Sequence, residues 1–120
     1  KMDYVQKGNT MYKLEKIQGI NFIHLEAPTY VVPALIPTSP LTWITWWVEL
    51  PEAEEILTSP HNEGSFVRNR NILVLVKDQG LYVTTHPTEV EPILLKSGFR
   101  RGRFNFTFGA NGEELAITPW

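Results

Sequence analysis

The residues best suited to acid–base chemistry in this sequence are its three histidines, His24, His61 and His86. None of them is spaced from another as paired zinc ligands are, for example at positions i and i+4 of a helix. A catalytic set could assemble from His61, Glu63 and Asp78, but nothing in their spacing requires it. We therefore predict no catalytic residues, no metal site and no cofactor. A small enzyme with an unrecognised site is the third of three hypotheses.

Arginine is concentrated in the second half of the chain, close to a run of phenylalanines. Basic side chains beside aromatic rings are how proteins hold single-stranded nucleic acid without reading its sequence. Alternation along 99–108 places Phe104, Phe106 and Phe108 on one face and the arginines elsewhere, which favours a core strand with a solvated outer face. Single-stranded nucleic-acid binding is therefore the alternative hypothesis. Its candidate residues are Arg68, Arg70, Arg100, Arg101 and Arg103.

The segment 41–50, LTWITWWVEL, holds three of the four tryptophans and is predicted to be a strand. Strand alternation places Trp46 among aliphatic residues, on an ordinary core face. The other face carries Trp43 and Trp47. A tryptophan ring buries on the order of 200 Å², so another element of the chain or a partner must cover this face.

The segment 28–40 precedes the tryptophan strand and contains four prolines among aliphatic residues. Because proline cannot donate to a sheet ladder, we expect an irregular extended crossover here. A solvated linker would be less apolar. The crossover is therefore expected to pack over the sheet of its own chain or to dock on another subunit.

The leading hypothesis is a non-catalytic protein-interaction module that self-associates, as a homodimer, through an aromatic and apolar surface. Tryptophan, tyrosine and arginine are the usual anchors of protein interfaces, and this chain carries all three outside obvious core positions. The competing account is that segment 31–36 or the helix after Pro87 covers Trp43 and Trp47 within one chain. The predicted interface residues are Tyr30, Val32, Leu35, Ile36, Trp43 and Trp47.

Strands are predicted where alternating or continuous apolar residues are bounded by turn signals. Residues 11–17 and 20–27 flank Gln18-Gly19, a tight hairpin turn. Residues 72–76 are consecutive aliphatics, which predicts a central strand buried on both faces. The remaining predictions are a turn at 78–80 into a strand over 81–86, a strand over 99–108, and a turn at 110–112 into a strand over 115–120.

Two short helices are predicted, over 51–57 and 87–97, and a polar loop over 59–71. Each helix begins with a proline, which suits a first helical turn. Pro92 conflicts with an uninterrupted second helix, so that helix either begins beside it or kinks there. Gly98 is expected to end the helix in the left-handed conformation.

Composition limits the partners of the chain. The net charge of −2 provides no field that would attract nucleic acid or an anionic membrane. The chain has no cysteine, which excludes disulfides and thiolate metal ligands, and no apolar run long enough for a transmembrane helix. We expect a soluble protein, intracellular rather than secreted.

Length and element order together predict the fold class. With 120 residues and 42% apolar content, the chain suits a single globular domain over 1–120. We predict an α+β, β-rich domain whose mostly antiparallel sheet has about six to seven strands, with two short helices and a Pro-rich crossover.

Overall fold

The computed structural model describes the backbone of residues 4–7, 10–26, 31–39, 42–49 and 53–110, and the side chains of residues 13–24, 48 and 53–107. The strands of this part of the chain are β1 (Tyr4–Lys7), β2 (Thr10–Ile17), β3 (Ile20–Glu26), β4 (Val31–Ser39), β5 (Thr42–Glu49), β6 (Ser65–Asn69), β7 (Ile72–Lys77), β8 (Gly80–Thr84), β9 (Arg100–Arg101) and β10 (Thr107–Ala110). The helices are α1 (Ala53–Thr58) and α2 (Pro87–Lys96).

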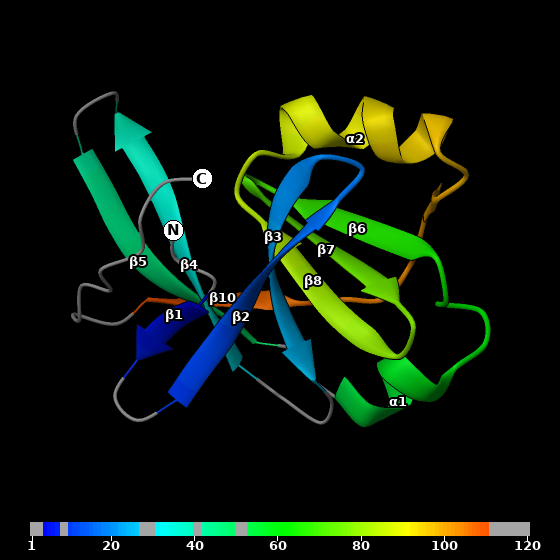
Figure 1. Cartoon of the computed structure of the whole chain (residues 1–120). Coiled ribbons are helices and arrows are strands. Elements are labelled where there is room, and N and C mark those ends of the chain that lie inside the picture. The colour runs from blue at the N-terminus through cyan, green and yellow to red at the C-terminus, as the bar shows by residue number, and fades with distance from the viewer. Residues whose placement is uncertain (1–3, 8–9, 27–30, 40–41, 50–52, 111–120) are drawn as a thin grey trace.

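The strands form two sheets (Figure 1). The larger has seven strands in the order β1-β2-β3-β8-β7-β6-β9, and the smaller has three in the order β10-β5-β4. Every pairing is antiparallel except that of β6 with β9. The predicted α+β, β-rich and mostly antiparallel architecture is confirmed, with the strands divided between two sheets.

Two hairpin turns follow directly from the local sequence. Gln18 and Gly19 have positive φ values of 54° and 80° between β2 and β3, and Asp78 and Gln79 have values of 52° and 59° between β7 and β8. Two consecutive left-handed residues make a type I′ turn, whose twist matches that of the flanking strands. Both predicted turns are confirmed, although Gly80 itself is the first residue of β8.

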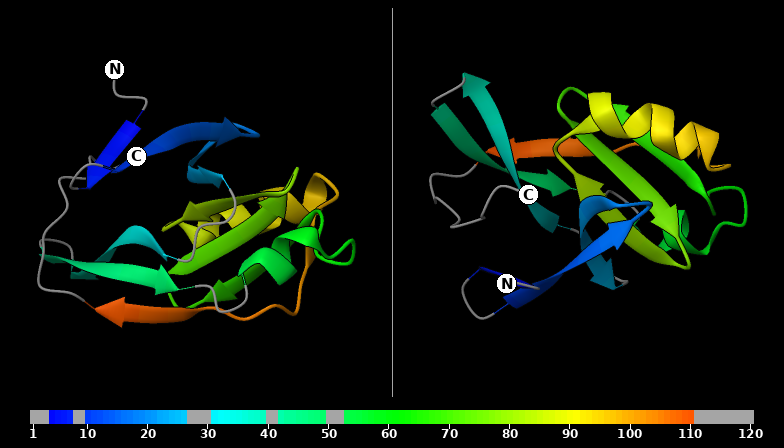
Figure 2. Two further views of the ribbon diagram at one scale, coloured as in Figure 1. Left: turned by 90° about the horizontal axis from the view of Figure 1, so that it is seen from below. Right: turned by 45° about the horizontal axis from the view of Figure 1, so that its top comes forward.

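The interior of the larger sheet is built on β7, whose residues 72–76 are all fully buried. Leu73 and Leu75 pack in one cluster with Val90 and Leu94 of α2. Figure 2 shows α2 lying across β6, β7 and β8. Alternation places Ile72, Val74 and Val76 on the opposite face, where they are also fully buried. The predicted burial of both faces of this strand is confirmed.

A second set of buried side chains lies outside the α2 cluster, and we place it on the opposite face of the larger sheet. These side chains come from three separate elements: β5, α1 and the segment after β9. They are Val48, Ala53, Ile56, Leu57, Phe104 and Phe106.

Helix α2 begins at Pro87 and continues through Pro92, so the predicted start beside Pro92 is wrong. The His86 carbonyl accepts the Val90 N–H at 3.1 Å, which establishes the first turn before Pro92 is reached. Pro92 has no N–H, so one carbonyl of the preceding turn lacks its helical hydrogen bond. Because Pro92 is exposed, water can bond this carbonyl oxygen. The predicted left-handed Gly98 is confirmed, with φ of 98°. Among the described residues, no helix has the length and apolar character needed to cross a membrane.

The predicted polar loop over 59–71 is wrong in its second half, where β6 forms. Phe66 is buried, and the strand pairs with β7 in a hairpin. Pairing with the adjacent strand β7 overrides the weak strand preference of this polar segment.

The Pro-rich segment is a strand and not an irregular crossover, which corrects a second prediction. β4 pairs with β5 along its whole length, with an irregularity between Pro37 and Ser39. Pro33 and Pro37 are an even number of residues apart, so the N–H groups that both prolines lack would point to the same side of the strand. β4 is the edge strand of the three-stranded sheet, and an edge strand tolerates proline on its unpaired side.

The single strand predicted over 99–108 is also wrong. β9 pairs with β6, β10 pairs with β5, and residues 102–106 between them form no regular element. The predicted alternation of side chains nevertheless holds, because Phe104 and Phe106 are buried while Arg103 and Asn105 are exposed. The turn and strand predicted beyond β10 lie outside the described residues.

Candidate functional site

The tryptophan strand β5 is the middle strand of the three-stranded sheet, and its two faces differ. Val48 is fully buried, so its face is directed toward the protein core. Alternation places Trp43 and Trp47 on the opposite face. The register sets Trp43 opposite Pro37 and Trp47 opposite Pro33 on β4. We call this the outer face of the three-stranded sheet.

The same register divides the residues predicted for the interface. Leu35 pairs with Thr45 and shares the outer face with both tryptophans. Val32 and Ile36 pair with Val48 and Ile44, and therefore lie on the core-directed face. Tyr30 lies outside the described residues.

Sequence reasoning missed the two prolines of the outer face. A signal was present, because Pro33 and Pro37 have the same spacing as Trp43 and Trp47. The equal spacing predicts that prolines and tryptophans lie opposite one another only once the antiparallel pairing of β4 and β5 is known.

Two of the five candidate arginines bind the same carboxylate on α2. Glu91 Oε1 lies 3.2 Å from Arg68 Nη1, and Glu91 Oε2 lies 2.9 Å from Arg101 Nε. Arg68 also donates to Thr88 Oγ1 at 3.2 Å. These contacts hold α2 to the β6–β9 edge of the larger sheet and neutralise part of the predicted basic surface.

The other three arginines have different surroundings. Arg100 is next to Arg101 in β9 and donates to the His61 carbonyl oxygen at 2.6 Å. Arg70 has positive φ in the turn between β6 and β7. Arg103 borders a hollow beside α1. The structure therefore distributes the five arginines over several elements.

The structure brings together only part of the catalytic set considered from sequence. Glu63 Oε2 accepts the backbone N–H of Asp78 at 2.8 Å, and Asp78 also pairs with Lys77 at 2.8 Å. His61 is exposed and contributes its carbonyl to Arg100. Within the described residues, no group of three acidic or histidine side chains is arranged to hold a metal ion.

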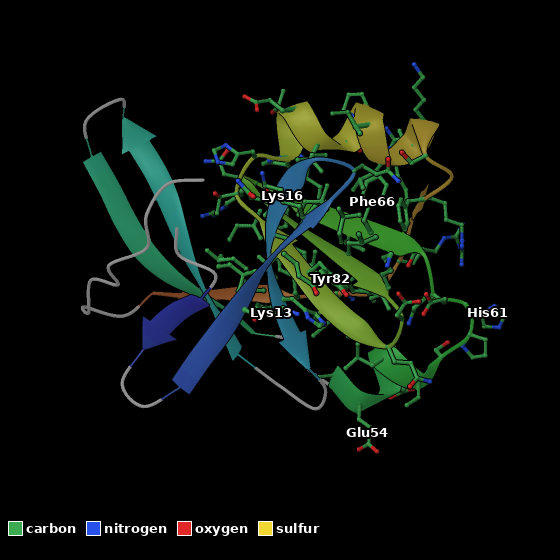
Figure 3. The ribbon with its side chains drawn as sticks, viewed as in Figure 1. Lys13, Lys16, Glu54, His61, Phe66 and Tyr82 are labelled. Atoms are coloured by element: carbon green, nitrogen blue, oxygen red, sulfur yellow. The ribbon has the colours of Figure 1, made fainter. Side chains whose placement is uncertain are left out.

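A polar cluster that sequence reasoning missed lies on β2, β3 and β8. The His24 and Tyr82 rings are stacked, with centroids 4.3 Å apart and an interplanar angle of 7°. Glu15 lies 3.5 Å from His24 Nδ1 and 3.2 Å from Lys13 Nζ. Figure 3 shows Lys13 and Tyr82 on this part of the sheet. No sequence signal predicts the cluster, because it depends on the pairing of β3 with β8.

The cluster shifts the titration of two of its members. Burial raises the pKa of Tyr82 to about 12, and the negative charge of Glu15 adds to the effect. Burial also raises the pKa of Glu15, but the hydrogen bond from Lys13 and the charges of His24 and Lys13 outweigh it, so this pKa lies below its ordinary value. The cluster is therefore a neutral phenol beside a paired carboxylate, and it stabilises the packing of β2 and β3 on β8.

A hollow of about 430 Å³ lies between the tip of the β2–β3 hairpin and the first half of α2. Ile20, Val90 and Ile93 give it an apolar lining, and His86 and Glu89 lie at the same place. Ile93 is apolar, yet its side chain is 41% exposed.

Comparison of the chain with protein-family models, with curated proteins and with solved structures finds no match.

Proposed function

We propose that this protein is a non-catalytic interaction module that forms homodimers through the outer face of its three-stranded sheet. The observation that carries the proposal is the pairing of Trp43 with Pro37 and of Trp47 with Pro33, on the face opposite the fully buried Val48. A face of this composition is costly to leave in water, because each tryptophan ring buries on the order of 200 Å².

The arrangement of α2 and β4 supports a second copy as the cover. Helix α2 packs through Val90 and Leu94 on the larger sheet. Segment 31–36 lies beside β5 in the same sheet, not over it. The two covers considered from sequence within one chain are therefore engaged elsewhere.

The dimer is proposed to form face to face and not edge to edge. The longer edge strand of the smaller sheet is β4, where Pro33 and Pro37 remove donors that an added strand would need, and the other edge strand, β10, has only four residues. Two copies of one face can meet about a twofold axis, as is usual in homodimers.

The size of the outer face predicts a weak dimer. β4 has nine residues and the sheet three strands. At about 3.3 Å per residue and about 4.8 Å per strand, the nine, eight and four residues of β4, β5 and β10 cover roughly 330 Å². Two such faces bury roughly 700 Å², less than the roughly 1,200–2,000 Å² of stable complexes. We therefore expect association that depends on concentration.

Sedimentation velocity over a concentration series tests the proposal. The wild type should shift from the 13.8 kDa monomer toward twice that mass as the concentration rises. Trp47→Ser combined with Leu35→Ser should give a folded monomer, and Thr45→Ser, on the same face, should dimerise like the wild type. A double variant that unfolds would show that the face is core, and a wild type that stays monomeric at every accessible concentration would refute self-association.

A further inference from the structure

A hollow of about 400 Å³ separates α1 from the segment that follows β9. Two walls of the hollow carry polar and apolar side chains that are far apart in sequence. Their principal residues are Glu55, Ile56 and Asn62 on one side and Arg103, Phe104 and Asn105 on the other. This volume lies within the range of small-molecule sites, roughly 300–1,000 Å³.

The wall that follows α1 is held by its own hydrogen bonds. The Asn62 side-chain amide donates to the Ile56 carbonyl at 3.0 Å, and the Asn62 N–H donates to the Ser59 carbonyl at 3.1 Å. The Ser59 N–H in turn donates to the Glu55 carbonyl at 3.1 Å. These bonds fix the loop against the helix, so the hollow exists before any ligand arrives.

The opposite wall is held by the close approach of Gly102 to β6. The Gly102 N–H donates to the Phe66 carbonyl at 2.7 Å. A Cβ atom at this position would lie 2.7 Å from Ser65 Oγ, and Ser65 is fully buried and donates to the Asn62 carbonyl. Only glycine fits here without displacing the wall. Phe104, two residues further along the chain, is buried in the core.

The two walls carry opposite charges. Glu55 and Arg103 are both exposed, and in the part of the chain that the structure describes neither forms an ion pair with another side chain. A guanidinium binds a carboxylate through two parallel hydrogen bonds. A carboxylate such as Glu55 attracts an ammonium group and repels a second acid. Polyanions are therefore disfavoured in this hollow, while a molecule with both charges is favoured.

We propose that this hollow binds a small zwitterion of dipeptide size, whose carboxylate contacts Arg103 and whose ammonium group contacts Glu55. A roughly cubic hollow of this volume is about 7 Å across, which is also the approximate span of an extended dipeptide. Ile56 and Phe104 provide an apolar floor for one side chain, and Asn105 lines the same hollow with an amide that can bond the peptide group.

Three matched probes test the two charge contacts by NMR titration of the ¹⁵N-labelled protein. Glycyl-leucine carries both charges, N-acetylglycyl-leucine lacks the ammonium group, and glycyl-leucinamide lacks the carboxylate. Glycyl-leucine should shift the amide signals of Asn62, Arg103 and Asn105. Each derivative should bind about fivefold more weakly, as expected of one exposed charge contact.

Variants assign each contact to a residue. Glu55→Gln should weaken glycyl-leucine binding about fivefold, so that this variant binds glycyl-leucine and N-acetylglycyl-leucine with equal affinity. Arg103→Gln should bind glycyl-leucine and glycyl-leucinamide with equal affinity. Glu54→Gln, an exposed change on the same helix that does not line the hollow, should leave all three affinities unchanged.

Two results would overturn the proposal. One is the absence of any shift at these amides at millimolar glycyl-leucine. The other is equal binding of glycyl-leucine and either derivative, which would leave at most a site for a single charge.

Discussion

The packing of His24 on Tyr82 restricts the residue type at a neighbouring position, Gly80. The His24 ring lies flat on Tyr82, and a Cβ atom on Gly80 would lie 2.6 Å from His24 Nε2. The glycine that begins β8 therefore makes room for the ring. Glu15 completes the group, because its negative charge helps to raise the pKa of Tyr82. The packing of β2, β3 and β8 at this point therefore depends on contacts among Glu15, His24 and Tyr82.

The raised pKa of Tyr82 predicts a loss of stability at high pH. Its folded pKa of about 12 exceeds the ordinary value of 10.0, so the neutral phenol stabilises the folded state. This contribution is complete below about pH 10 and is lost as the pH rises toward about 12. Denaturant unfolding across this window should show a steeper decline for the wild type than for Tyr82→Phe. Parallel declines would contradict the prediction.

At the scale of elements, α2 is attached to the larger sheet by apolar packing on one side and by charge on the other. Val90 and Leu94 join the core cluster, while Glu91 bridges Arg68 of β6 and Arg101 of β9. The Glu91 side chain is only 18% exposed, so solvent screens these contacts less than an ordinary surface pair. Glu91 also joins the short parallel strand β9 to the rest of the fold.

Replacing Glu91 by glutamine should weaken this attachment. The change removes the charge that two arginines share, and we expect a loss of about 1 kcal/mol in the free energy of unfolding. Glu89→Gln is the matched control, because Glu89 is exposed on the same helix. Urea unfolding measures both variants, and equal losses would mean that the shared ion pair contributes nothing of its own.

At the scale of the whole molecule, two sheets meet around a common interior. β4 lies against β8, and Val48 of the smaller sheet is fully buried. The radius of gyration of 13.4 Å matches the value of about 13–14 Å for a compact chain of this length. The outer face of the smaller sheet and the hollow beside α1 are formed by different elements, so the two proposals can succeed or fail independently.

The overall charge distribution predicts no binding to single-stranded DNA or RNA. The net charge is −2, and Glu91 neutralises part of the arginine set. Nonspecific binding depends on the release of counterions by basic side chains, so it would be strongest at low salt. A gel shift at low salt should be negative for the wild type. A salt-sensitive shift that is lost when Arg100, Arg101 and Arg103 are changed to serine would contradict this expectation.

Features that depend on neighbouring residues can be predicted from the amino-acid sequence. The turns at Gln18-Gly19 and Asp78-Gln79 follow from local backbone preferences, and the burial of 72–76 follows from five consecutive aliphatic side chains. The alternation of Phe104 and Phe106 with exposed polar residues is local in the same sense. Such signals need no knowledge of the partner strand.

The contacts between distant segments, in contrast, could not be predicted from local sequence. Pro33 and Pro37 disfavour a strand by local rules, yet β4 forms because it occupies a sheet edge where missing donors cost little. The strand predicted over 99–108 is divided because its two ends pair with different sheets. The shared carboxylate of Glu91 likewise depends on contacts between elements far apart in the chain. Register and edge position are properties of the assembled sheet, so no local pattern encodes them.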